Sequence, residues 1–107
     1  MTVVRYLRTP NILRSNMDAT DLKLLDLAGK AAGEKFDSNR NPLERDDLAL
    51  RLAVKLRMII EISYDAHEVR VDLHSGHHWT EFCDIDPYAA TRRAVVHAAA
   101  ELGKQMN

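Results

Sequence analysis

The chain of 107 residues has little of what marks several familiar classes of protein. Its single cysteine, Cys83, excludes a disulfide framework and a zinc site built from cysteines. No apolar run approaches the roughly 20 residues that a membrane-spanning helix needs. The 15 Lys and Arg residues nearly balance the 16 Asp and Glu residues, so the formal net charge of −1 attracts no nucleic acid wholesale.

Common catalytic motifs are also missing, because the chain contains no GxSxG, no Walker-type loop and no GxGxxG. The acidic residues that stand close together have structural uses. Asp86 precedes a proline at an expected helix start, and Asp46 and Asp47 lie in the first turns of another expected helix. We therefore expect no enzymatic activity and no cofactor.

What the chain does contain is an apolar fraction of 46%, enough for one core of modest size. Residues 1–16 stand apart because they carry Arg5, Arg8 and Arg14 and no acidic residue. We expect this segment to be a basic arm or extension, and residues 17–107 to form a single domain.

Apolar residues at helical spacing predict three helices. The first runs from about Ala19 to Gly33 with Asp18 as its N-cap, and the last runs from Asp86-Pro87 to about Gly103. The second begins at Asn41-Pro42 and continues to about Leu56. Its apolar arc is widened by Leu50 and Val54, which predicts burial along much of its length.

At Met58 the period of the apolar residues changes to two, which is typical of strands. Ile60, Ile62 and Tyr64 alternate with other residues in a first strand, and Val69, Val71 and Leu73 do so in a second. A third strand is expected from His77 through Ile85. The short links between them predict an antiparallel meander, and the order α-α-β-β-β-α predicts the α+β class.

This arrangement resembles the phage ABA-sandwich proteins and their relatives of the NinX type. The segments that carry the resemblance are DLKLLDLAGKAAG, DSNRNPLERDDLALRLAVKL, HHWTEFCDI and DIDPYAATRRAVVHAAAEL. The resemblance implies phage or prophage origin, the cytoplasm of a bacterial host, and a role without established catalytic residues. Proteins of this kind often act by occupying the surface of a host protein, as anti-CRISPR inhibitors of host defence do.

The expected partner is therefore a host or phage protein, and the expected surface is the strand hairpins. Trp79 and Tyr64 are the candidate aromatic anchors, because binding energy concentrates in such residues. The full candidate set is Tyr64, His67, Arg70, Asp72, His74, His77, His78, Trp79 and Glu81.

Two alternatives use other chemistry. His74 and His77 flank the Ser75-Gly76 turn and, with Asp72, could form a metal site of a metal-binding or hydrolytic protein. A nucleic-acid-associated regulator would instead use basic residues. Its candidates are Arg5, Arg8, Arg14, Arg92 and Arg93.

Self-association is a further hypothesis. Small residues in the first and last expected helices permit close packing, and a meander leaves an edge strand unpaired. Because one chain has little core of its own, pairing would bury more apolar area, which predicts a homodimer.

Overall fold

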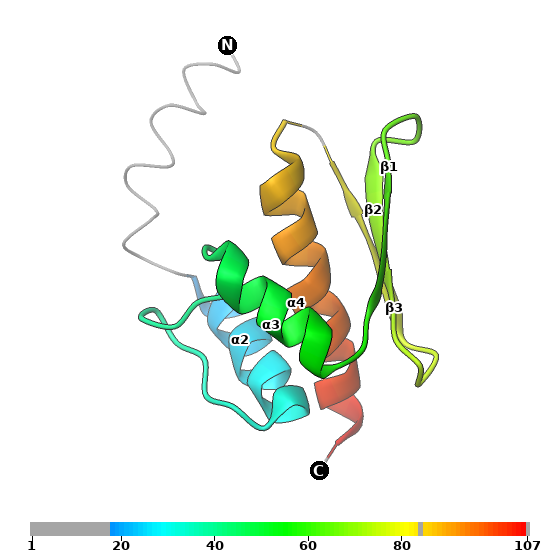
Figure 1. Ribbon diagram of the computed structural model, residues 1–107. Coiled ribbons are helices and arrows are strands. Elements are labelled where there is room, and N and C mark those ends of the chain that lie inside the picture. Colours follow the sequence, from blue (N-terminus) through cyan, green and yellow to red (C-terminus); the bar gives the residue numbers. More distant parts are fainter. Residues whose placement is uncertain (1–17, 84, 107) are drawn as a thin grey trace.

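The computed structural model describes residues 18–83 and 85–106, which fold as three helices and a three-stranded sheet (Figure 1). The elements in chain order are α2 (Ala19–Ala32), α3 (Asp46–Lys55), β1 (Ile59–Ser63), β2 (Glu68–Asp72), β3 (His78–Phe82) and α4 (Pro87–Gln105). The predicted α+β class and the order α-α-β-β-β-α are confirmed. The expected arm at 1–16 lies outside the described residues.

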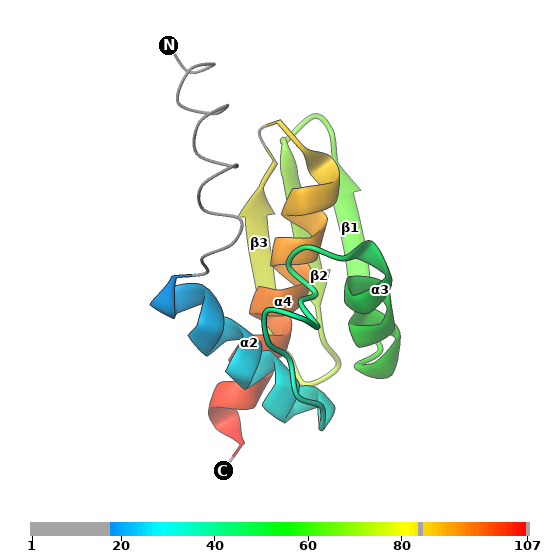
Figure 2. The ribbon, with the colours of Figure 1, turned by 90° about the vertical axis from the view of Figure 1, so that its left-hand side faces the viewer.

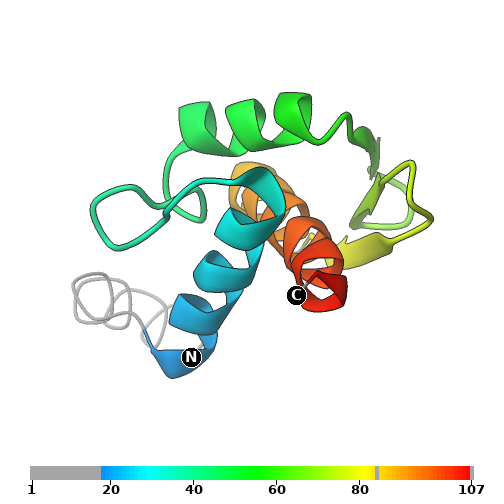
Figure 3. The same cartoon turned by 90° about the horizontal axis from the view of Figure 1, so that it is seen from below.

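The sheet is an antiparallel meander in which β2 lies between β1 and β3. Val71 pairs with Ile60 on one side and with Trp79 on the other, so these three side chains share a face. Figures 2 and 3 show the three helices on one side of the sheet. Val69 and Val71 point to that side and are fully buried, whereas Arg70 between them is exposed. The period-two prediction for β2 is therefore correct.

Helix α4 forms the centre of the molecule, packing against α2, α3, β2 and β3. Its buried residues are mostly alanines, which let neighbouring elements approach closely. At Gly103 the approach to α2 is so close that a Cβ added there would overlap the backbone carbonyl of Leu27. The core then continues through larger side chains. Its fully buried members include Leu25, Leu52, Val69, Val71, Val95 and Val96.

The ends of α2 and α4 follow the predicted capping residues. A carboxyl oxygen of Asp18 accepts a hydrogen bond from the Asp21 amide at 2.9 Å, and Gly33 ends α2 with a φ of 70°. Asp86 caps α4 by accepting from the amides of Tyr88 and Ala89. Helix α4 extends slightly beyond the predicted end, to Gln105.

The predicted start of the second helix is wrong. The side chain of Asn41 accepts a hydrogen bond from the Leu43 amide at 2.9 Å, so it closes a separate turn instead of capping the helix. Arg45 then adopts extended backbone angles, with φ −119° and ψ 120°, which interrupt any helix running from this turn. Helix α3 therefore begins at Asp46.

The predicted burial of the second helix is also wrong in part. Leu50 is 63% exposed and Val54 is 69% exposed. Helix α3 packs against α4 through Ala49, Leu52 and neighbouring residues, but within the described chain no element covers its other apolar side.

A smaller difference concerns the last strand. Strand β3 ends at Phe82 and not at Ile85, which is exposed. Tyr88, in the first turn of α4, is also exposed.

Candidate protein-docking groove

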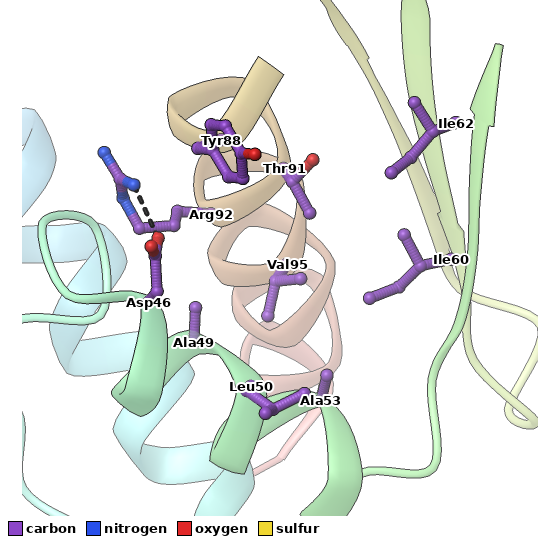
Figure 4. Close-up of a pocket in the computed structure, with 10 residues that line it drawn as sticks. All are labelled: Asp46, Ala49, Leu50, Ala53, Ile60, Ile62, Tyr88, Thr91, Arg92 and Val95. Carbon is purple, nitrogen blue, oxygen red and sulfur yellow. Dashed lines mark hydrogen bonds and ion pairs between the residues drawn. The ribbon is translucent and has the colours of Figure 1, made fainter. Parts of the chain in front are cut away.

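A groove with a volume of about 330 Å³ lies between α3, α4 and β1 (Figure 4). Its lining is almost entirely apolar. The ten lining residues are Asp46, Ala49, Leu50, Ala53, Ile60, Ile62, Tyr88, Thr91, Arg92 and Val95.

The groove is open because β1 extends beyond the helical cover of the sheet. Ile60 and Ile62 point to the same face as their partners Val71 and Val69. The two valines are 0% exposed, whereas Ile60 is 37% and Ile62 is 45% exposed. Helix α4 packs over β2 and β3 but makes far less contact with β1, so the isoleucines form one wall of the groove.

One end of the groove is polar and is fixed by Arg92 of α4. Its Nε donates to the backbone carbonyl of Leu43 at 2.9 Å, and its guanidinium also donates to the Asp46 carboxylate at 2.6 Å. Arg92 thereby holds the first residue of α3 and the preceding turn against α4. The ion pair is visible beside Tyr88 in Figure 4. The polar end of the groove is therefore held in place by hydrogen bonds. In the described chain no other element covers the apolar walls.

Comparison of the chain with protein-family models, curated proteins and solved structures finds no match. The functional assignment must therefore come from the geometry of this chain.

The structure does not bring the sequence-predicted binding residues together on one surface. Tyr64 and His67 lie in the turn between β1 and β2, whereas His74 and His77 lie in the turn at the other end of β2. Between the two turns the remaining candidates divide between the faces of the sheet. Trp79 and Glu81 share the helix-covered face with Val71 and Val69, and Arg70, Asp72 and His78 lie on the opposite face.

The two candidate anchors differ in their surroundings. Tyr64 is 78% exposed. Trp79 is half-buried, packs against the core, and donates a hydrogen bond from its indole nitrogen to Glu81 at 2.8 Å. Its ring stacks on His97 of α4. Trp79 is thus largely committed within the chain, while Tyr64 remains available to a partner.

The polar candidates are engaged in local contacts. Arg70 donates to both carboxyl oxygens of Asp72, and these hydrogen bonds hold the pKa of Asp72 below its ordinary value. At the tip of the second turn, His77 Nδ1 lies 2.6 Å from the Ser75 hydroxyl. His74, His78 and His67 are exposed.

The structure also shows where the residues of the two alternative hypotheses lie, those of the metal site and those of the nucleic-acid-binding surface. Among residues 18–83 and 85–106, no three His, Cys, Asp or Glu side chains lie together as a metal site requires, so His74, His77 and Asp72 form no such group. Arg92 faces the groove, and Arg93 lies 3.8 Å from Asp21 in an ion pair. Arg5, Arg8 and Arg14 lie outside the described residues.

In the described chain, no helix has both the length and the apolar character that crossing a membrane demands.

Sequence reasoning missed the groove itself. One available signal was the run Ile59-Ile60-Glu61-Ile62, which places isoleucines on both faces of one strand. The other was the width of the apolar arc of α3, which Leu50 and Val54 make larger than packing against a single helix requires.

Proposed function

We propose that this chain is a non-enzymatic accessory protein of phage or prophage origin, which acts by docking another polypeptide in the groove of α3, α4 and β1. The observation that carries the proposal is the exposure of Leu50, Ile60 and Ile62 around one concave apolar site.

The physical argument starts from the cost of exposing apolar surface to water. Each square ångström of apolar surface removed from water contributes about 25 cal/mol. An apolar side chain inserted in the groove therefore gains binding free energy from its own buried surface and from the surface of the walls that it covers. Concave apolar sites that bury a few anchors are where binding energy concentrates. The Arg92–Asp46 pair at one end supplies a polar rim that can orient the docked segment.

The shifted carboxyls of the described chain are explained by ion pairs. The pKa values of Glu34, Asp47 and Asp72 are lowered, chiefly by hydrogen bonds from arginines. Where shifted carboxyls occur in the described chain, they belong to structural ion pairs.

The phage or prophage origin is supported by the resemblance of the helix and strand pattern to the ABA-sandwich proteins. The setting that follows is the cytoplasm of a bacterial host, and the partner is a protein of the host or of the phage. Inhibition of a host defence protein is one activity of this kind.

Affinity capture with matched variants tests the proposal. The groove variant combines Leu50→Lys with Ile62→Lys. The control variant combines Val54→Lys with Phe82→Lys, which places the same charges on exposed apolar residues of α3 and the sheet that do not line the groove. Thermal unfolding monitored by circular dichroism verifies that both variants fold.

The expected result is a protein retained by the wild-type chain and by the control variant but lost with the groove variant. Capture of the same proteins by both variants would remove the groove from the proposal.

A further inference from the structure

We propose that the polypeptide docked at this groove is a second copy of the chain, and that two β1 strands pair antiparallel about a two-fold axis. This inference rests on the proposed function, because it names the occupant of the same site. It follows from the edge of the sheet, from the distribution of charge along it, and from the side chains of β1.

The first observation is the bare edge of the sheet. In the described chain β1 pairs only with β2, so the backbone groups along its other side have no strand partner. Edge strands are usually protected by several charged side chains, proline, a bulge or a covering element, and β1 has one charged residue, Glu61. Strand β1 reads Ile-Ile-Glu-Ile-Ser, and its three isoleucines are all exposed. A strand of this composition is suited to pairing with another strand.

The second observation is that charge changes sign from one end of β1 to the other. Arg57 precedes the strand, is exposed, and forms no ion pair within the described chain. At the far end, Asp65 is exposed in the turn after the strand, whereas the Asp46 carboxylate at the start of α3 is compensated by Arg92. Figure 4 shows Ile62 toward the Tyr88 end of the groove and Leu50 at the other end, with Ile60 between them.

A two-fold axis makes such a surface complementary to itself. Antiparallel pairing reverses the direction of the second strand, so the arginine end of each chain meets the aspartate end of the other. A parallel arrangement would bring like charges together. The polarity of the edge therefore favours a second copy in the antiparallel orientation.

The side chains of β1 also select a register. With Glu61 at the axis, two carboxylates would lie directly opposite each other, which is unfavourable. With Ile60 at the axis, isoleucine faces isoleucine and Arg57 of one chain faces Ser63 of the other, two positions from Asp65. All helices then lie on one side of a continuous sheet, and the isoleucines of each β1 lie beside the groove of the other chain.

Sedimentation equilibrium of the purified chain, between about 1 and about 100 μM, tests the inference with charge reversals. The wild-type chain is expected to be a dimer in this range. Arg57→Glu and Asp65→Lys should each weaken the dimer by roughly tenfold or more, and the double variant should recover most of the loss because the charges are exchanged. Both residues are exposed, so the variants should fold.

Three outcomes would overturn the inference: a wild-type monomer at about 100 μM, a dimer that is insensitive to either single reversal, or a double variant no better than the singles. If a variant fails to fold, amide hydrogen exchange of the wild-type chain, measured at several concentrations, tests the dimer instead. The β1 amides should become more protected as concentration rises, and unchanged protection counts against the dimer. The two proposals can be told apart. If the chain is a monomer and the groove variant still fails to capture a protein that the wild-type chain retains, the inferred dimer is refuted but the proposed function is not.

Discussion

The indole of Trp79 and the imidazole of His97 stack with their centroids 4.1 Å apart and their planes within 8° of parallel. Trp79 belongs to β3 and His97 to α4, so the pair ties one edge of the sheet to the central helix. Burial lowers the pKa of His97 despite the opposing effects of Glu81, Glu101 and Asp21; Arg93 reinforces the lowering. The folded protein therefore favours the neutral ring more strongly than the unfolded chain does.

This relationship predicts a dependence of stability on pH. Below the ordinary histidine pKa of about 6.5, the unfolded chain binds a proton at His97 that the folded chain binds only at lower pH. The free energy of unfolding should therefore fall as pH drops through this interval. Urea unfolding at a series of pH values measures it.

The matched control is His97→Phe, which keeps an aromatic ring against Trp79 but cannot titrate. The wild-type chain should lose more stability on acidification than this variant does. Parallel pH profiles for the two proteins would contradict the assigned role of His97.

The close approach of α2 and α4 predicts an inverted effect at Gly103. In an ordinary helix interior, Gly→Ala stabilises by roughly 1 kcal/mol. Here the new Cβ would overlap the Leu27 carbonyl, so Gly103→Ala should destabilise the protein by about 1–3 kcal/mol. Chemical denaturation gives the sign, and a gain in stability would show that the two helices are farther apart.

Arg92 and Arg93 provide a comparison of two neighbouring arginines. Arg92 bonds the Leu43 carbonyl and Asp46, and its side chain is mostly buried, so Arg92→Ala should cost about 1–3 kcal/mol. Arg93 makes a long surface ion pair with Asp21, so Arg93→Ala should change stability by about 0.5 kcal/mol or less. Equal losses in urea unfolding would contradict this account of the polar end of the groove.

Two leucines in the first half of α2 test the orientation of that helix. Leu25 is fully buried, and Leu25→Ala should cost about 2–5 kcal/mol through lost packing and a residual cavity. Leu22 is about half exposed, and Leu22→Ala should cost clearly less. Thermal and urea unfolding measure both losses of stability. A larger loss for Leu22→Ala than for Leu25→Ala would show that the helix is rotated.

Much of the fold could be predicted from local patterns. Asp18, Gly33 and Asp86-Pro87 mark helix ends through interactions within a few residues, and the alternation of Val69 and Val71 reflects a sheet with one covered face. The start of α3 could not be read in this way. Asn41-Pro42 can close a turn as readily as it can begin a helix. In this chain it closes a turn, and the extended backbone of Arg45 separates that turn from α3.

The candidate site was harder to predict, because the groove exists only where no helix or strand packs against an apolar face. Periodicity shows that Leu50 and Ile62 lie on apolar faces, but it does not show whether anything packs against those faces. The placement of the histidines depends on the fold in a related way. His67 and His77 are close in sequence, yet they lie at opposite ends of β2 because a strand separates their turns.

The most direct test of the account places a photoreactive amino acid at Ile62, in the groove, or at Phe82, on the uncovered face of β3. The account predicts crosslinking to a polypeptide from Ile62, with a product of twice the chain mass if the occupant is a second copy, and little from Phe82. No product from Ile62, or equal yields from both positions, would contradict the groove as the docking site.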